Sequence, residues 1–182
     1  LEQELIEKSD LELSTPDVRV RLLPRRSALI GRPSSAKAVD VAVGCRWFSR
    51  GEKNLRLFAE GTGWFVEDLG STNGSSIGDR TLTPGMPYAL PLGETLIEIG
   101  KREGTAAPIA VSLRRPPANP GAVVMSLVAD ETRLADSAEE GKWPSWREDL
   151  RTNWVLFDGR IGLGTSASGV IVLAEAGAYI MP

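Results

Sequence analysis

The 182-residue sequence contains no histidine. This absence removes the side chain most often used in acid–base catalysis and the commonest metal ligand. The only cysteine is Cys45, so neither an intramolecular disulfide nor a thiolate metal cluster can form. Both absences count against catalysis, metal binding and a cofactor. Cys45 follows an alternating apolar run, which predicts a small buried residue rather than a reactive thiol.

The sequence also lacks any apolar run of the about 20 residues that a membrane-spanning helix needs. Its opening, residues 1–10, is acidic and does not resemble a signal peptide. The net charge of -3 gives no broad positive field for nucleic acid or an anionic membrane. We therefore expect a cytoplasmic protein that binds neither. The chain starts with leucine and stops after an apolar run, which predicts a fragment of a longer protein.

Period-two alternation of apolar residues dominates from Val18 onward and predicts β-strands. Residues 18–22 alternate apolar and basic, and residues 55–58 and 64–68 flank a glycine-containing hairpin turn. Short strands with turn residues between them, and no long helical pattern, are typical of a β-sandwich. Further strands are expected at 28–30, 39–43, 88–90, 96–99 and 109–113.

Three regions are expected along the chain. Residues 1–15 form an acidic lead, and residues 16–115 form the β domain. The stretch 114–121 contains three prolines and a glycine, which predicts a linker. Within it, Arg114 and Arg115 are predicted to be solvent-exposed. Residues 116–182 then form a separate, mostly β region.

The C-terminal region invites two further interpretations. Its glycine-rich run at 159–169 has no lysine and precedes a strand-like run, which argues against a nucleotide loop. Its spacing is similar to that around residues 30–41, which favours the start of a partial, degenerate second module. Trp143, Trp146 and Trp154 either form a partner surface or pack against the neighbouring domain.

Three motifs stand in order between residues 31 and 74. They are Gly31-Arg32, Ser49-Arg50 and the run DLGSTNG at 68–74, which follows a strand-like stretch. In this order they resemble the signature of forkhead-associated (FHA) domains, and residues 92–100 are similar to a closing strand of that family. The resemblance implies an all-β fold over residues 16–115, an FHA-like eleven-stranded β-sandwich.

The resemblance further implies that loops at one end bind phosphothreonine peptides. A phosphate has about two negative charges and three acceptor oxygens, so it needs a cation and several donors. By motif, Arg32 would support its loop and lie near the phosphate, while Ser49 and Thr72 would donate their hydroxyls to it. Arg50 would contact the phosphate or the peptide backbone, and Asn73 would hold the peptide main chain.

Four residues are expected to support these loops rather than touch the ligand: Gly31, Asn54, Gly70 and Gly74. Gly70 and Gly74 allow the loop to turn tightly without a Cβ clash. The family commonly has a histidine three residues after the serine, where this chain has Glu52. With a two-residue insertion in the loop, Asn54 is the counterpart of that histidine.

The expected function is that of a non-catalytic signalling or adaptor module that binds phosphothreonine peptides. Its partner would be a phosphorylated protein or a Ser/Thr kinase. The alternative is a degenerate FHA-like scaffold that assembles without phosphate, through self-association or with neighbouring domains of a longer chain. The missing histidine and the acidic Glu52 favour that alternative.

Overall fold

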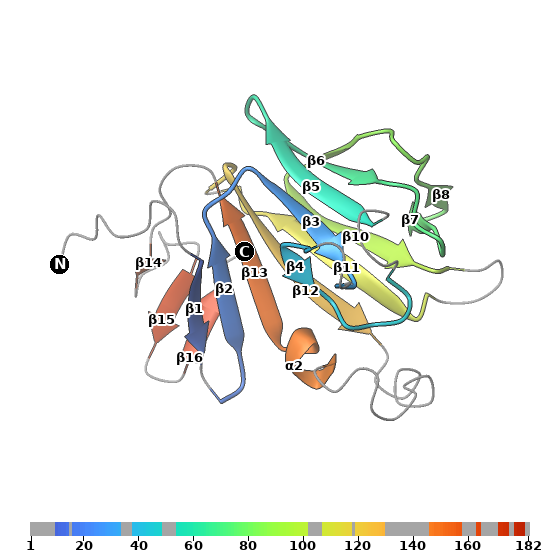
Figure 1. Ribbon diagram of the computed structural model, residues 1–182. Helices are drawn as coiled ribbons and strands as arrows, with labels where there is room; N and C mark the ends of the chain where they lie inside the picture. The colour runs from blue at the N-terminus through green and yellow to red at the C-terminus, as the bar shows by residue number, and fades with distance from the viewer. Residues whose placement is uncertain are drawn as a thin grey trace.

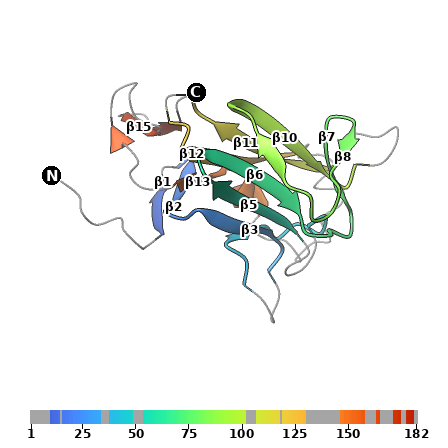
Figure 2. The ribbon, with the colours of Figure 1, turned by 90° about the horizontal axis from the view of Figure 1, so that it is seen from above.

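The alternating apolar residues lie on strands of two β-sheets that pack face to face (Figure 1). The fold is therefore the predicted all-β, FHA-like sandwich. Figure 2 shows the two layers edge-on, with β3, β5 and β6 in one and β10 and β11 in the other. The computed structural model describes residues 10–14, 16–33, 38–48, 54–101, 107–117, 119–129, 146–157, 163–164, 171–174 and 177–180.

The smaller sheet has five strands, all paired antiparallel except β3 with β4. Its buried residues alternate along each strand, as in β6, where Trp64, Val66 and Asp68 point inward. The strand order is β4 (Val41–Ala42), β3 (Ser27–Gly31), β5 (Leu55–Glu60), β6 (Gly63–Asp68) and β9 (Tyr88–Leu90).

The larger sheet has eight strands and includes segments from both ends of the chain. All neighbours pair antiparallel except β2 with β13, which run parallel. The order is β1 (Leu11–Ser14), β2 (Arg19–Leu23), β13 (Thr152–Phe157), β12 (Ala122–Ala129), β11 (Ile109–Arg115), β10 (Gly93–Ile99), β7 (Ser75–Ile77) and β8 (Arg80–Thr81).

Strands β12 and β13 lie between β11 and β2 in this sheet, although both follow the predicted linker. The linker stretch is a turn, closed by the Asn119 amide, which donates to the Pro116 carbonyl at 3.0 Å. The boundary predicted at residue 116 therefore falls between two hydrogen-bonded strands. The boundary predicted at residue 15 does likewise, because Leu11–Ser14 form β1, which pairs with β2.

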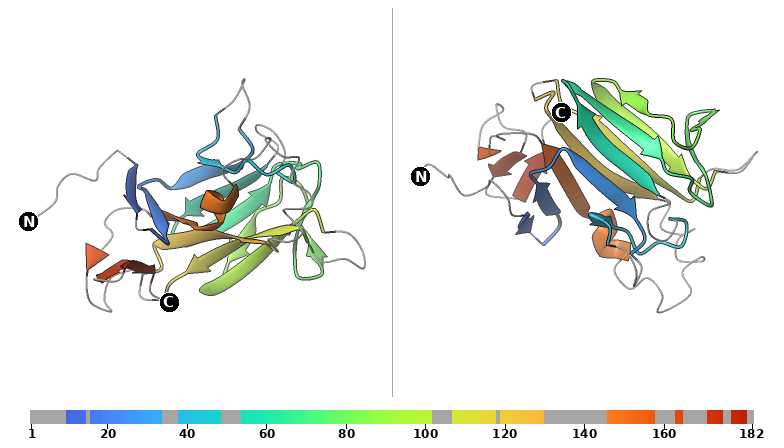
Figure 3. Two further views of the ribbon diagram at one scale, coloured as in Figure 1. Left: turned by 90° about the horizontal axis from the view of Figure 1, so that it is seen from below. Right: turned by 45° about the horizontal axis from the view of Figure 1, so that its top comes forward.

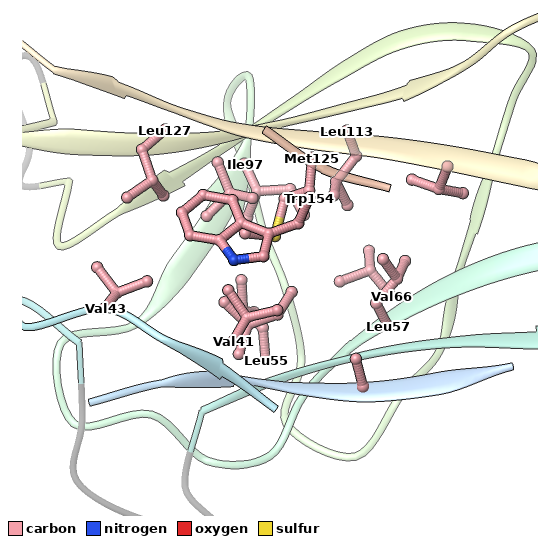
Figure 4. Close-up of a cluster of buried hydrophobic side chains, with 14 of the residues drawn as sticks. Val41, Val43, Leu55, Leu57, Val66, Ile97, Leu113, Met125, Leu127 and Trp154 are labelled. Atoms are coloured by element: carbon pink, nitrogen blue, oxygen red, sulfur yellow. The ribbon is translucent and has the colours of Figure 1, made fainter. Parts of the chain in front are cut away.

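Trp154 of β13 belongs to the core between the sheets and is 2% exposed. Figure 4 shows its indole ring among Val41 and Leu55 of the small sheet and Ile97 and Met125 of the large one. Of the two alternatives for Trp154, the structure therefore supports packing against the rest of the β domain and excludes a partner surface. Truncating a buried tryptophan usually destabilises a fold by about 3 kcal/mol or more. Strand β13 is therefore an integral part of the sandwich.

The outward face of β2, β12 and β13 carries a second cluster of buried apolar residues. Side chains alternate between the two faces along a strand, so Val155 and Phe157 point away from the core that Trp154 and Leu156 join. This alternation explains why all six residues of β13 except Asn153 are buried. The members are Val20, Leu22, Ala122, Val124, Val155 and Phe157.

Arg115 is buried at the end of β11, so the prediction that it is solvent-exposed is wrong. Its guanidinium donates to the carbonyls of Leu90 at 2.6 Å, Pro120 at 3.1 Å and Thr62 at 3.3 Å. These carbonyls lie at the end of β9, in the β11–β12 turn and in the β5–β6 turn. Arg115 therefore joins three connections at one end of the sandwich.

The short helix α2 (Trp146–Leu150) precedes β13 and contacts β12 (Figure 3). The remaining strands, β14 (Leu163–Gly164), β15 (Ile171–Ala174) and β16 (Gly177–Ile180), form a separate three-stranded sheet. That a second degenerate module begins here stays a prediction. Trp143 and the acidic residues at 130–142 lie outside the described residues. None of the described helices is both long and apolar enough to cross a membrane.

Candidate functional site

Four connections meet at the end of the sandwich opposite Arg115: those after β3, β4, β6 and β10. The Asn73 side-chain amide donates to the Trp47 carbonyl at 2.7 Å and joins the loop after β6 to the loop after β4. The Gly100 amide donates to the Gly74 carbonyl at 3.1 Å and brings in the end of β10. The Val43 amide donates to the Gly31 carbonyl at 2.9 Å. The first and third predicted motifs are therefore brought together at one end.

Asp68, the last residue of β6, organises the loop that follows it. It is 1% exposed, and its Oδ1 accepts from the amides of Gly70 at 2.8 Å and Ser71 at 2.7 Å. Its Oδ2 accepts from the hydroxyl of Ser71 at 2.7 Å and from that of Ser75. A carboxylate that caps successive loop amides in this way fixes the path of the chain. Asp68 was not among the residues predicted from the sequence, although an Asp just before Leu-Gly-Ser is a recognisable signal for an Asx-turn.

Gly70 and Gly74 bracket Thr72 and Asn73, and both have positive φ, 88° and 74° respectively. This backbone region is unfavourable for residues with a Cβ, so the two glycines shape the loop as predicted from the motif. Between them, the side chains of Thr72 and Asn73 are exposed. The loop thus presents a hydroxyl and an amide at the surface.

Gly31 and Asn54 pack directly against each other below the loops. A Cβ at position 31 would lie 2.1 Å from Asn54 Nδ2 and 2.2 Å from its Cγ. Asn54 is 2% exposed, and its carbonyl accepts from the Leu69 amide at 2.8 Å. Asn54 is therefore buried between the first and third motifs. That it replaces the family histidine stays a prediction.

Arg32 continues directly from β3 into the next loop and is half-buried. Ser49 and Arg50, the second predicted motif, lie outside the described residues, as does Glu52. Phe48, the residue before Ser49, is buried in the core, and its amide donates to the Cys45 carbonyl at 3.1 Å.

Arg46 and Trp47 are two residues of this end that the sequence analysis missed. Trp47 is half-buried, and its Cε3 would lie 3.0 Å from a Cβ at Gly100. Arg46 is exposed, with its guanidinium carbon 5.2 Å from the Trp47 ring centroid. An arginine next to a tryptophan in a loop is a weak signal without the fold, because contact with Gly100 depends on tertiary structure.

Cys45 is buried beneath these loops, as predicted. Burial raises the pKa of its thiol from the ordinary 9.0 to about 11, against smaller lowering effects that include the charges of Arg46 and Arg32. The thiol is therefore protonated at neutral pH. No group of three or more potential metal-binding His, Cys, Asp or Glu side chains occurs within the described ranges.

The raised pKa of Cys45 predicts a loss of stability at alkaline pH. The folded-state pKa of the thiol lies above the unfolded one. The contribution of the protonated thiol to the free energy of unfolding is therefore fully present below about pH 9 and is lost as pH rises through 11. The loss should reach about 2 kcal/mol at pH 11, by the conversion of about 1.4 kcal/mol per pH unit. Urea unfolding between pH 8 and 11 measures it, with Cys45→Ala as the control. Equal pH dependence of the two proteins would rule out this linkage.

Comparison with known protein families agrees with the geometry. Residues 28–100 match the family model of the FHA domain, which spans β3 to the end of β10 and includes all three motifs. A search of curated proteins found no match to the chain. The FHA domain is a general phosphopeptide-binding module. The motifs, the sandwich and this match together identify residues 28–100 as an FHA domain.

Proposed function

We propose that the loops after β3, β4 and β6 bind phosphothreonine peptides reversibly and that the domain catalyses no reaction. The observation that carries this proposal is the FHA match over residues 28–100, which contains every residue assigned to the ligand. The hydrogen bond from Asn73 to Trp47 supports it, because it holds two of the loops together. The partner would be a protein phosphorylated by a Ser/Thr kinase, or the kinase itself.

In this proposal Arg32 and Arg50 supply positive charge, while Ser49 and Thr72 donate hydroxyl groups to the phosphate. Charge-assisted hydrogen bonds to a phosphate are the strongest that such a surface can offer. Asn73 would hold the peptide main chain next to the phosphothreonine. Removal of the phosphate would leave these donors without a partner, so dephosphorylation would release the ligand.

Thr72→Ala is expected to weaken phosphothreonine-peptide binding by about 10-fold or more, because it removes one hydroxyl donor to a charged acceptor. Thr72 is exposed, so the melting temperature should not change by more than about 2 °C. Isothermal calorimetry measures the affinity. Thr62→Ala is the matched control, since Thr62 is an exposed threonine in the β5–β6 turn at the opposite end. Equal affinity of Thr72→Ala and the unmodified protein would contradict the assignment.

The alternative is a scaffold that binds partners without phosphate, and the replacement of the family histidine by Asn54 is the observation in its favour. The two functions differ in their response to salt. Capture of a phosphate by arginines weakens as ionic strength rises, whereas apolar packing between proteins does not. Binding that is insensitive both to salt and to phosphatase treatment would favour the scaffold.

A further inference from the structure

The side chain of Arg46 is held in place at the ligand end of the domain. Its guanidinium lies over the Trp47 ring, which attracts a cation through its π electrons. Trp47 in turn is fixed by two neighbouring loops. Its carbonyl accepts from Asn73 at 2.7 Å, and its ring packs on Gly100. Arg46 is therefore an oriented cation next to the loop that presents Thr72.

Several other basic side chains already have an acidic partner. Arg19, Arg21, Arg25 and Arg56 each form a salt bridge with an aspartate or a glutamate. Lys101, which follows Gly100, is paired with Glu98 at 2.8 Å and donates to the Gly78 carbonyl at 3.0 Å. In the part of the chain that the structure describes, no carboxylate forms a salt bridge with Arg46.

Arg46 and Arg32, the arginine proposed to bind the phosphate, both lie near the buried Cys45. Both guanidinium groups lie near enough to the Cys45 thiol to lower its pKa against the effect of burial. Two positive charges thus lie at this end of the sandwich, one on each of two loops. In the proposed site, Arg32 and the hydroxyl donors Ser49 and Thr72 bind the phosphate. Arg46 has no part in that binding, so it can bind a second anion.

We propose that Arg46 is a specificity-determining residue that selects ligands with a second anionic group beside the phosphothreonine. A carboxylate side chain and a second phosphate share the chemistry that a guanidinium recognises, because each offers paired oxygens to its planar fork. Trp47 holds that fork in advance, which lowers the entropic cost of binding. This inference rests on the proposed function.

The test compares affinities for three synthetic phosphothreonine peptides that share one backbone sequence. One has alanine at the flanking positions, one has glutamate and one has phosphoserine. The unmodified protein should bind the glutamate or phosphoserine peptide about fivefold more tightly than the alanine peptide, as one well-placed ion pair provides. Which of the two gains more distinguishes a carboxylate from a second phosphate.

Arg46→Ala should remove this preference. It should leave the affinity for the alanine peptide within about twofold, because that peptide has no second anion to pair with Arg46. Arg46→Lys should keep part of the preference, because the positive charge remains. It should lose the rest, because lysine lacks the planar guanidinium that binds paired oxygens. Arg26→Ala is the control. It removes the same charge from the turn between β2 and β3 at the opposite end, where Arg26 donates to the Gly61 carbonyl.

The outcomes separate the two proposals. Equal affinity of the unmodified protein for all three peptides overturns the role of Arg46 and leaves phosphothreonine binding intact. A preference that survives in Arg46→Ala, or is lost equally in Arg26→Ala, also overturns it. No binding of any of the three peptides by protein with a native circular dichroism spectrum overturns the proposed function, and this inference with it.

Discussion

Asp68→Ala is expected to lower the free energy of unfolding by about 3 kcal/mol, because it leaves one buried and three partly buried donors without an acceptor. Two amides and two hydroxyls donate to this one carboxylate, which is 1% exposed. The loss should also extend to ligand binding, since the same bonds fix the loop that carries Thr72. Chemical denaturation monitored by tryptophan fluorescence measures the first effect, and calorimetry with a phosphopeptide measures the second.

Asp68→Asn is the matched variant and should cost only about 1 kcal/mol. The amide oxygen can still accept from the amides of Gly70 and Ser71. The hydroxyls of Ser71 and Ser75 can rotate and accept from the new NH₂ group, because a hydroxyl is both donor and acceptor. If alanine and asparagine destabilise the domain equally, the loop does not depend on these hydrogen bonds.

Gly31→Ala should destabilise the domain by about 3 kcal/mol, at the upper end of the usual cost of overpacking. The added methyl group would lie 2.1 Å from Asn54 Nδ2 and 2.7 Å from Asn54 Cβ, so the whole buried side chain must move. Gly31 has no positive φ, so the cost comes from this clash and not from backbone strain. Thermal and urea unfolding both measure the effect.

A double-mutant cycle identifies the cause. In the background of Asn54→Gly all three Asn54 side-chain atoms that the added methyl group would meet first are absent, Cβ included, so Gly31→Ala should cost far less there than in the unmodified protein. Gly121→Ala provides the control, because its Cβ would meet nothing closer than 3.6 Å. Additive effects of the two substitutions would show that Gly31 and Asn54 do not share one tightly packed space.

Local patterns predicted the FHA strands well. Alternation located β2, β5, β6 and β10, because each buries one face and follows period two. The run DLGSTNG predicted the loop after β6 together with its two positive-φ glycines. These features depend on residues close together in the sequence, so the sequence alone reveals them.

Pairing between distant segments was not predictable. Nothing near Thr152 indicates that it pairs with Arg19 in a parallel ladder, because parallel neighbours leave no turn signal between them. The prolines after Arg115 indicated a linker, whereas they fit equally well in a turn between two strands of one sheet. Arg115 was misplaced for the same reason, since segments far away in the sequence bury it. The two alternatives for Trp154 could not be separated without the fold.

The candidate site shows the same division. Motif residues such as Gly70, Gly74 and Asn54 were identified through the resemblance to FHA domains, and the structure places them below or beside one cluster of loops. Asp68, Arg46 and Trp47 were missed because their importance comes from contacts that the fold creates, such as that of Trp47 with Asn73.

The most direct test of the account is capture from an oriented phosphothreonine peptide library, with the same library left unphosphorylated as control. It should be carried out at low and at physiological ionic strength, on protein whose fold has been checked by circular dichroism. If these loops bind phosphothreonine, the protein captures phosphorylated peptides selectively, and the capture weakens with salt. Equal capture from both libraries, or no capture by the folded protein, would contradict the claim that these loops bind phosphothreonine.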